Sequence, residues 1–376
     1  MDFQSVHDIP DLRGKRVLVR ASLNVPVEDG VVTSDFRIRK ALPTIAFLKQ
    51  AGARVIVAGH IGREKEETLR PVYEAFQKHF DLEWCPRAVG GEARVAVEAL
   101  QEGEVLLLEN LRQHEGEKEN SDAFAKALAA LADVYVNDAF SVSHREHASI
   151  VGVSKLLPSY AGLTFLDEYE HLQKAMRPES PSLFILGGAK FATKLPLIDE
   201  YADIYDYMFI GGALANDLLK ARGCPVGKSV VSDVVLDDAS MVRDETVLLP
   251  VDVTVTDGEI TRVTTPDDVK ESEYIYDAGP KTIAMLREKL ATTKTVLWNG
   301  PLGYYEHGFA EYTKQCAEEI ARSSAHSIVG GGDTVAAIES LGLHTEFDFI
   351  STAGGAMLEF LEKKTLPGIE ALKESK

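Results

Sequence analysis

Short apolar runs recur along this chain, and their recurrence constrains the fold more than any other feature of the sequence. The runs are rich in Val, Ile and Leu and lack the polar alternation of a strand with one face in water. Each therefore predicts a strand buried on both faces. The nine runs are Arg16 to Val19, Arg54 to Ala58, Val105 to Leu108, Val134 to Val136, Leu183 to Leu186, Met208 to Ile210, Thr295 to Trp298, Ser327 to Val329 and Phe347 to Ile350.

Segments with helical spacing lie between these runs, for example Ile38 to Gln50 and Ser121 to Leu131. Strands that alternate with helices predict parallel sheets covered on both faces, which is an α/β, doubly wound fold. The length of 376 residues suggests two domains rather than one. We place the first over residues 1–165 and the second over residues 181–364. The charged, helically spaced segment Phe165 to Arg177 overlaps the linker expected between them, residues 166–180.

The charge balance argues against one class of partner. Acidic residues number 59 and basic residues 40, which gives a formal net charge of −19. This excess repels phosphate backbones, so we expect no nucleic acid partner. An anionic substrate must instead be captured by a local cluster of Arg, Lys and backbone N–H groups.

Two other classes of protein are disfavoured by sequence pattern. No stretch approaches the roughly 18 apolar residues of a membrane span, and the N-terminal segment lacks a signal pattern, so we expect a cytoplasmic protein without a membrane partner. Cys85, Cys224 and Cys316 lie far apart and form no CxxC pair. Neither a disulfide framework nor a thiolate zinc site is therefore expected.

Basic side chains follow the predicted strands of the first half. In open α/β sheets, ligands bind at the carboxyl ends of the strands, so these side chains are expected to converge there. A guanidinium fork matches carboxylate and phosphate oxygens, so the cluster suits a small molecule with several negative charges. Any single arginine can instead pair with an acidic neighbour. Arg20 and Arg39 are the weakest members, because each has a close neighbour in the same stretch that can fill the role, and His147, beside Glu146, is equally well a structural hydrogen-bonding group. The candidates are Arg20, Arg37, Arg39, Arg63, Arg112 and Arg145, with His60, His144 and His147.

Glycine clusters follow the predicted strands of the second half. GGAK at Gly187 to Lys190 continues as FATKL, so Lys190 and Lys194 share one helical face. Such turns let phosphates approach the backbone, and two lysines can neutralise a transferring phosphoryl group. In GGGDT at Gly330 to Thr334, Asp333 is a candidate ligand of Mg²⁺, or a helix cap. With neither a P-loop nor a GxGxxG motif present, these turns still indicate a nucleotide site.

Taken together, these motifs are similar to those of the phosphoglycerate kinases, in the same order and over essentially the whole chain. The matching segments are VRASLNVP, DFRI with ALPTI, AGHIGR, LLLENLR, VNDAFSVSHREH, LGGAKFATK, PVD, DAGP, WNGPLGYYE, GGGDT and STAGGA. The resemblance implies two doubly wound, Rossmann-like domains joined by a hinge helix around a central cleft. It also implies that the C-terminal tail, residues 365–376, packs back on the N-terminal, phosphoglycerate-binding domain.

The resemblance further implies the reaction and its reactants. The activity would be reversible phosphoryl transfer between 1,3-bisphosphoglycerate and ADP, giving 3-phosphoglycerate and ATP, in a glycolytic enzyme that is a monomer. The two domains would close during turnover, and Mg²⁺ would accompany the ATP or ADP.

Site residues carried over from the resemblance fall into three groups. Arg37, Lys190 and Lys194 would act on the transferring phosphoryl, and Asp333 would ligate the Mg²⁺. The acid would be held by Ser22, Asn24, Arg37, His60, Arg63, Arg112 and Arg145. The nucleotide would be held by Lys194, Gly211, Gly212, Asn299, Pro301, Glu306, Gly331, Gly332, Asp333 and Thr334.

Several positions depart from the family pattern, among them Gln113 and the segment GGALA at Gly211 to Ala215. Ser22 stands where the family has a carboxylate that bonds the substrate hydroxyl, Thr193 replaces an acidic residue, and Ala353 replaces a glycine. Two alternatives therefore stay open. One is a divergent homologue that binds nucleotide but phosphorylates another small acid, and the other is a homologue with a non-catalytic regulatory role.

Overall fold

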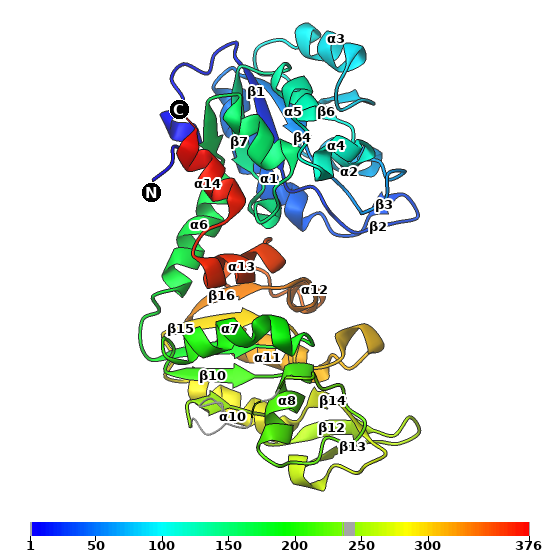
Figure 1. Ribbon diagram of the computed structural model, residues 1–376, viewed down its shortest axis with the longest axis vertical. Coiled ribbons are helices and arrows are strands. Elements are labelled where there is room, and N and C mark those ends of the chain that lie inside the picture. Colours follow the sequence, from blue (N-terminus) through cyan, green and yellow to red (C-terminus); the bar gives the residue numbers. More distant parts are fainter. Residues whose placement is uncertain (1, 235, 237–244, 376) are drawn as a thin grey trace. The chain divides into compact units, whose positions relative to one another are not determined.

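The computed structural model describes residues 2–234, 236 and 245–375, and its chain divides into two compact units (Figure 1). The first unit comprises Met1–Glu170 with Lys363–Lys376, and the second comprises His171–Glu362. The domain ranges expected from the sequence also include residues 1, 235, 237–244 and 376, which lie outside the described residues.

The first unit is built on a sheet of six parallel strands. Their spatial order is β5 (Glu83–Cys85), β6 (Val105–Leu108), β4 (Arg54–Ala58), β1 (Arg16–Ala21), β7 (Val134–Asp138) and β8 (Ser159–Ala161). The chain starts near the middle of this sheet and winds outward in both directions, which is the doubly wound topology predicted from the sequence.

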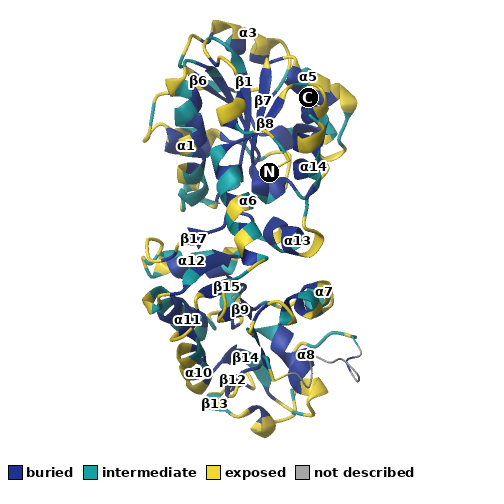
Figure 2. Cartoon of the chain, turned by 90° about the vertical axis from the view of Figure 1, so that its left-hand side faces the viewer, coloured by how far each residue is buried: buried dark blue, intermediate teal, exposed yellow. Residues whose placement is uncertain are grey.

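Both faces of this sheet are covered by helices. Val17 and Val19 of β1 belong to one apolar cluster with residues of α1 (Phe36–Gln50) and α2 (Arg70–Phe76). Leu18, between them, belongs to another cluster with residues of α3 (Gly91–Ala99) and α5 (Asp122–Ala129). Successive side chains of a strand point to opposite faces of the sheet. When both faces are buried, successive positions of the strand are therefore apolar, without alternating polar residues. Figure 2 shows these strands as buried and the outer surface of α3 as exposed.

Short elements complete the first unit. The two-stranded hairpin β2–β3 precedes α1, and α6 carries the chain on toward the second unit. Their bounds are η1 (Val6–Asp8), β2 (Val27–Glu28), β3 (Val31–Val32), η2 (Leu111–Gln113), α4 (Glu115–Lys118), η3 (Phe140–Val142), η4 (Ala148–Gly152), η5 (Val153–Lys155) and α6 (Leu163–Ala175).

The second unit repeats the architecture with a second sheet of six parallel strands. The order is β11 (Val247–Leu248), β10 (Tyr207–Ile210), β9 (Ser182–Leu186), β15 (Thr295–Asn299), β16 (His326–Gly330) and β17 (Phe349–Ile350). Its helical elements are α7 (Phe191–Ala202), α8 (Ala213–Ala221), η6 (Pro266–Asp268), α10 (Pro280–Leu290), η7 (Tyr305–His307), α11 (Glu311–Arg322), α12 (Gly332–Ser340) and α13 (Gly355–Lys363).

Eight of the nine apolar runs lie within strands of these two parallel sheets, and the ninth, Phe347 to Ile350, contributes its last two residues to β17, which confirms the predicted fold class. Three short strands at sheet edges, β5, β8 and β11, were not predicted. The sequence analysis also missed a three-stranded antiparallel sheet in the order β13 (Thr261–Thr264), β12 (Val253–Thr256) and β14 (Tyr274–Ala278). Strands β12 and β13 contain threonines, and β13 is partly exposed, so their sequences are less apolar than the nine runs.

The C-terminal segment belongs to the first unit. In helix α14 (Pro367–Glu374), Pro367 stands at the first turn, where a missing N–H is harmless. The N–H of Gly368 donates to the carbonyl oxygen of Ser143 at 2.8 Å, and the N–H of Ser159 donates to Ser375 Oγ at 2.9 Å. Ala371 joins the apolar cluster of η3 and η4.

Helix α6 begins against the buried carboxylate of Asp138, at the end of β7. Asp138 Oδ1 accepts the N–H groups of Thr164 at 2.9 Å and Phe165 at 3.1 Å, so it satisfies two donors of the first helical turn. A Cβ atom on Gly162 would lie 2.2 Å from Asp138 Oδ1. The close approach of this carboxylate therefore requires glycine at position 162.

We predict that Gly162→Ala lowers the free energy of unfolding by about 1–3 kcal/mol, because the new methyl group overpacks the junction of β7 and α6. Denaturant unfolding monitored by circular dichroism measures this loss. Gly91→Ala is the control, since a Cβ there has no atom within 4 Å. Equal stability of the two variants would contradict the interpretation.

Candidate active site

The carboxyl ends of the first sheet bring several predicted basic side chains together. Arg20 lies near the end of β1, His60 follows β4, and Arg112 lies in η2, directly after β6. These three strands are neighbours in the sheet, and all three side chains are buried. The convergence that the parallel sheet predicts is therefore present for this trio.

Arg20 is 1% exposed and holds its neighbours through directed hydrogen bonds. Its Nε donates to Ser149 Oγ at 2.9 Å, its Nη1 donates to the carbonyl oxygen of Ala21 at 2.6 Å, and its Nη2 lies 2.9 Å from His60 Nδ1. Burial lowers its pKa from the ordinary arginine value. Arg20, a weak candidate from the sequence, is thus a central group of the cluster.

Electrostatic repulsion inside the cluster is visible in the pKa values of its members. Burial, with Arg145 and Arg20 nearby, lowers the pKa of Arg112 to about 10. Burial and the neighbouring arginines also hold the pKa of His60 well below its usual value. Arg112 Nη1 donates to the carbonyl oxygen of Gly62, whereas its buried Nε has no hydrogen-bond partner among the described residues. An excess of buried positive charge with an unused donor suits an anionic ligand.

The loop after β1 supplies the other predicted contacts to the acid. Asn24 Oδ1 accepts the N–H of Gly62 at 2.8 Å, and Arg37 Nη1 donates to the carbonyl oxygen of Asn24 at 2.5 Å. Burial lowers the pKa of Arg37, while Glu168 acts in the opposite direction. Ser22 Oγ and Ser141 Oγ are 2.7 Å apart, so a neutral hydroxyl pair stands where the resemblance implies a carboxylate.

Other basic candidates occupy different surroundings. The side chains of Arg63 and Arg145 are exposed, although Arg145 lies close enough to influence Arg112 and His60. Arg39 forms an exposed ion pair with Asp35 at 2.8 Å on α1, which is the acidic-neighbour alternative considered for it. His147 is buried, and its Nδ1 lies 3.7 Å from a carboxylate oxygen of Glu117.

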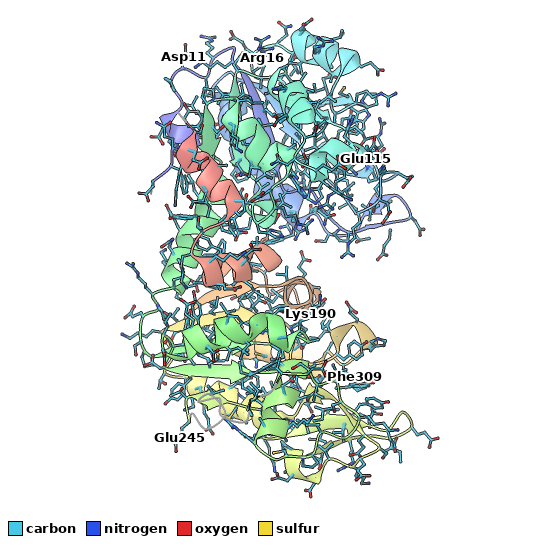
Figure 3. The ribbon with its side chains drawn as sticks, viewed as in Figure 1. Asp11, Arg16, Glu115, Lys190, Glu245 and Phe309 are labelled. Carbon is cyan, nitrogen blue, oxygen red and sulfur yellow. The ribbon has the colours of Figure 1, made fainter. Side chains whose placement is uncertain are left out.

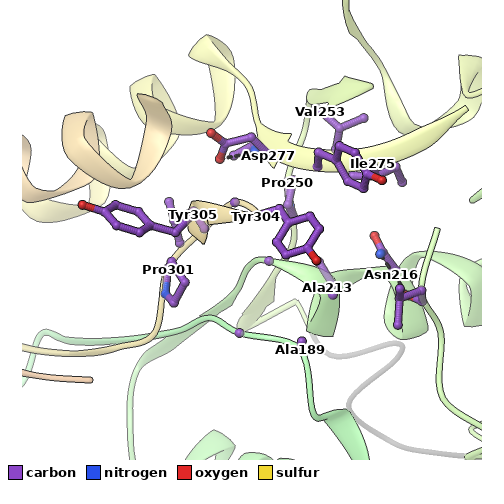
Figure 4. Close-up of a pocket in the computed structure, with 18 of the residues that line it drawn as sticks. Ala189, Ala213, Asn216, Pro250, Val253, Ile275, Asp277, Pro301, Tyr304 and Tyr305 are labelled. Atoms are coloured by element: carbon purple, nitrogen blue, oxygen red, sulfur yellow. Dashed lines mark hydrogen bonds between the residues drawn. The ribbon is translucent and has the colours of Figure 1, made fainter. Parts of the chain in front are cut away.

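The second unit contains a cavity of about 470 Å³, a volume within the usual range for small-molecule sites. Of the predicted nucleotide residues, Gly212, Pro301, Glu306 and Asp333 line it. Figure 4 shows Val253 and Ile275 on one side of this cavity and Ala189 and Ala213 across from them. Other lining residues are Gly188, Leu219, Val230, Tyr274, Tyr276, Asp277 and Tyr304.

Close backbone approaches explain the glycines of this region. A Cβ on Gly187 would lie 2.1 Å from the carbonyl oxygen of Pro301. Gly212 has a φ of +61°, and its Cβ would lie 2.8 Å from the backbone nitrogen of Gly188. Three loops thus meet at distances that only glycine allows.

The two predicted lysines stand at the start of α7 but differ in burial. Lys190, labelled in Figure 3, is exposed and immediately precedes the helix. Lys194 is half-buried, its Nζ donates to the carbonyl oxygen of Gly187 at 2.8 Å, and burial lowers its pKa to about 8. Lys194 is therefore held against the glycine loop, while Lys190 extends into solvent.

Asp333 lies on the cavity wall near the start of α12. The residue that caps this helix is Gly331, and no side chain bonds the first turn, so the alternative that Asp333 is a helix cap is wrong. Burial and the nearby carboxylate of Glu306 raise the pKa of Asp333. Thr334 Oγ1 instead accepts the N–H of Gly300 at 3.0 Å, which ties two loops together.

Several predicted nucleotide residues do not line the cavity. Asn299 is buried, and its Nδ2 lies 3.5 Å from Met357 Sδ. A Cβ on Gly211 would lie 2.8 Å from Leu302, a residue that does line the cavity. The lining residues do not include Lys190, Lys194, Gly211, Asn299, Gly331, Gly332 or Thr334.

Two acidic residues that the sequence analysis did not select are part of these sites. Glu117 is fully buried beside the basic cluster, and Asp277 lines the cavity. Burial raises the pKa of Asp277 to about 7, and its carboxylate accepts the N–H of Ala278 at 2.9 Å. The signal for Asp277 was its place in the quoted DAGP segment, whereas nothing local distinguishes Glu117 among many acidic neighbours.

The donor set at Asp333 fits a cation that is carried mainly by phosphate oxygens. Among the described residues, no group of three or more His, Cys, Asp or Glu side chains is placed to hold a metal ion. A single carboxylate, with a second close enough to perturb it, is the set that Mg²⁺ uses when phosphates supply its remaining ligands.

Fold and sites together define a two-domain α/β protein with a cationic site in one unit and a glycine-walled cavity in the other. The family model for phosphoglycerate kinase matches residues 6–364. The chain belongs to the phosphoglycerate kinase family, and it is accordingly a kinase, a phosphotransferase with a carboxyl group as acceptor. The expectation drawn from its motifs is thereby confirmed.

Relatives and solved structures match over the full length. A phosphoglycerate kinase of Rhizorhabdus wittichii is 43% identical, over 99% of this chain and 100% of the relative. One from Rubrobacter xylanophilus is also 43% identical, over 100% of this chain and 99% of the relative. The structure of phosphoglycerate kinase from Coxiella burnetii matches with a TM-score of 0.85 at 37% identity, covering 100% of both chains. That from Pyrococcus horikoshii OT3 matches with a TM-score of 0.87 at 30% identity, covering 99% of each.

We predict that Lys194 titrates near pH 8 rather than near the ordinary value of 10.5, because burial disfavours its ammonium form. Competitive labelling with trace acetic anhydride, followed by peptide mass spectrometry, measures the neutral fraction of this amine at each pH. Lys194→Arg identifies the peptide signal by removing it. A midpoint near 10.5 for Lys194 would show that the side chain is solvated.

Proposed function

We propose that this protein catalyses reversible phosphoryl transfer between 1,3-bisphosphoglycerate and ADP, giving 3-phosphoglycerate and ATP. The observation that carries the proposal is the buried positive charge of Arg20 and Arg112 beside His60, on a chain whose net charge is −19. A phosphorylated carboxylic acid carries negative charge at both ends, which suits a cluster of guanidinium groups. Membership of the phosphoglycerate kinase family supports the same reaction.

In this proposal the first unit holds the acid. Arg112, with its unused buried donor, and His60 face the anion, while Asn24 shapes the loop that Arg37 contacts. Arg63 and Arg145 are exposed side chains that close on the ligand from solvent. Ser22 offers the substrate a neutral hydroxyl, paired with that of Ser141.

The second unit would hold the nucleotide in its cavity. The apolar side chains Val253 and Ile275 suit a base, Glu306 suits a ribose, and the glycine loops suit phosphates. Asp333 would hold Mg²⁺, which neutralises phosphate charge when bound. Gly211, Asn299, Gly331, Gly332 and Thr334 would also contact the nucleotide, and Thr334 Oγ1 holds the backbone of Gly300 in place.

Positioning and charge neutralisation would supply most of the catalysis. The phosphoryl group passes between a carboxylate oxygen of the acid and the terminal phosphate oxygen of ADP, and such a transfer needs little covalent help from protein. Arg37, Lys190 and Lys194 would stabilise the charge that spreads over the transferring group. Because acid and nucleotide are held by different units, the proposal includes a domain closure, with α6 as the hinge helix.

Surroundings and assembly also belong to the proposal. We infer a monomer that works in the cytoplasm with small-molecule reactants only. Among the described residues, no helix is both long and apolar enough to cross a bilayer.

We predict turnover of 3-phosphoglycerate with MgATP in an assay coupled to NADH oxidation, and a loss of at least about 100-fold in kcat for Lys190→Ala. Lys294→Ala is the matched control, because that lysine forms an exposed ion pair with Glu179 and such pairs contribute little. Absence of turnover with nucleotide binding intact would indicate a homologue that phosphorylates another acid or serves a regulatory role.

We further predict that Arg112→Ala raises the KM for 3-phosphoglycerate by about 10- to 100-fold and leaves the KM for MgATP unchanged. The physical reason is loss of charge-assisted hydrogen bonds in the first unit only. Steady-state kinetics with each substrate varied in turn measures both constants. Arg39→Ala, which breaks an exposed ion pair, should change neither; a rise in both constants for Arg112→Ala would contradict the assignment.

A further inference from the structure

We propose that Glu117 and Ser149 are positioning residues that act through Arg20 to hold His60 as one neutral tautomer, with its proton on Nε2. His60 then offers a hydrogen-bond donor to an anionic ligand without adding a positive charge. The tautomer follows from the geometry of the first unit, whereas the identity of the ligand rests on the proposed function.

Each bond of the relay has a forced direction. A guanidinium only donates and a carboxylate only accepts, so the groups at both ends fix the hydroxyl between them. Ser149 Oγ donates to Glu117 Oε1 at 2.6 Å and accepts from Arg20 Nε at 2.9 Å. Arg20 Nη2 must in turn donate to His60 Nδ1, at 2.9 Å. A nitrogen that accepts carries no proton, which leaves the proton of the neutral ring on Nε2.

Glu117 anchors this relay from inside the unit. Its side chain is fully buried, and its second oxygen, Oε2, accepts the backbone N–H of Ser149 at 2.9 Å. A buried charge must be paired to be tolerated, and here the bridging hydroxyl links this carboxylate to the buried Arg20. Without Glu117, Arg20 would lose its compensating charge and Ser149 its fixed orientation.

The charged groups around His60 oppose any second proton on the ring. Arg20, Arg112, Arg145 and His147 all lie close enough to disfavour the imidazolium form, in addition to the effect of burial. The alternative neutral tautomer would place a proton on Nδ1, directly against a donating hydrogen of Arg20. The relay therefore selects the donor form at Nε2, which has no hydrogen bond to any described residue.

Nothing in local sequence suggested this role. The four residues come from β1, the loop after β4, the short helix α4 and η4. Arg20 and His60 were predicted as members of one anion-binding cluster, with Arg20 among its weakest. The structure places Arg20 Nη2 against His60 Nδ1 and Arg20 Nη1 against the carbonyl oxygen of Ala21.

The first experiment observes the tautomer directly in the full-length wild-type protein. Long-range ¹H–¹⁵N correlation spectra distinguish a protonated from an unprotonated ring nitrogen, and His60→Gln identifies the His60 signals. We expect an unprotonated Nδ1 and a protonated Nε2 from pH 6 to 8. A proton on Nδ1, or an imidazolium in this range, would overturn the proposal without need of any relay variant.

The second experiment breaks the relay at its two remote members. Ser149→Ala removes the bridging hydroxyl, and Glu117→Gln removes the charge; we expect each to raise the KM for 3-phosphoglycerate about 10-fold and to leave that for MgATP unchanged. The tautomer signal should become a mixture in the same variants. Ser154→Ala is the matched control, a nearby buried serine whose hydroxyl donates to the carbonyl oxygen of Ile150 at 2.7 Å.

A double-mutant cycle separates positioning from general stability. If the relay acts through His60, Ser149→Ala has no further effect on that KM in a His60→Gln background. Additive losses, or equal losses in the Ser154→Ala control, would overturn the proposal. Should Ser149→Ala and Glu117→Gln both fail to fold, the wild-type spectra still show which ring nitrogen of His60 carries the proton and so test the proposed tautomer.

Failure of the proposed function has a different signature. In that case the wild type shows no turnover of 3-phosphoglycerate, but the Nε2–H tautomer is still present and changes in the relay variants. If the relay proposal fails instead, the wild type turns over 3-phosphoglycerate, but Ser149→Ala and Glu117→Gln leave the tautomer of His60 or the KM for 3-phosphoglycerate unchanged.

Discussion

Burial of each parallel sheet on both faces is the constraint on which the rest of this structure depends. A strand such as β1 contributes apolar side chains to two separate clusters, so it has no face left for chemistry. Polar and charged groups of the site are therefore confined to the last residues of the strands and to the segments that follow them, where Arg20, His60 and Arg112 gather. The location of the site at the carboxyl ends of the strands therefore follows from the fold, whichever residues occupy it.

Charge is arranged at two scales. The whole chain carries a net charge of −19, yet the first unit concentrates buried positive charge around His60. Burial weakens solvent screening, so the local cluster acts on a bound anion more strongly than distant surface carboxylates do. In the second unit the local charge is negative instead, since the carboxylates of Asp277 and Asp333 line the cavity. Burial raises the pKa of both carboxylates.

The fold class and nine strands of the two parallel sheets could be predicted from the sequence, because two-sided burial leaves an unbroken apolar pattern. The edge strands β5, β8 and β11 could not, since strands of two or three residues carry too little pattern. Residue types at strand ends also predicted the trio of Arg20, His60 and Arg112 and the pair Lys190 and Lys194. The difference in burial between the two lysines could not be predicted, because the expected common helical face is wrong: α7 begins at Phe191, after Lys190. Glu117 lies 97 residues from Arg20 in the chain and is linked to it through Ser149. No local sequence pattern predicts such a pairing.

Helix α14 has a consequence for how the molecule is made. The first unit takes its residues from both sides of the second, because α14 contributes Ala371 to an apolar cluster with η3 and η4. A ribosome delivers α14 only after it has synthesised the whole second unit. The first unit must therefore wait in a partly finished state during synthesis, with the surface beneath α14 uncovered, while the second unit already has all of its own strands.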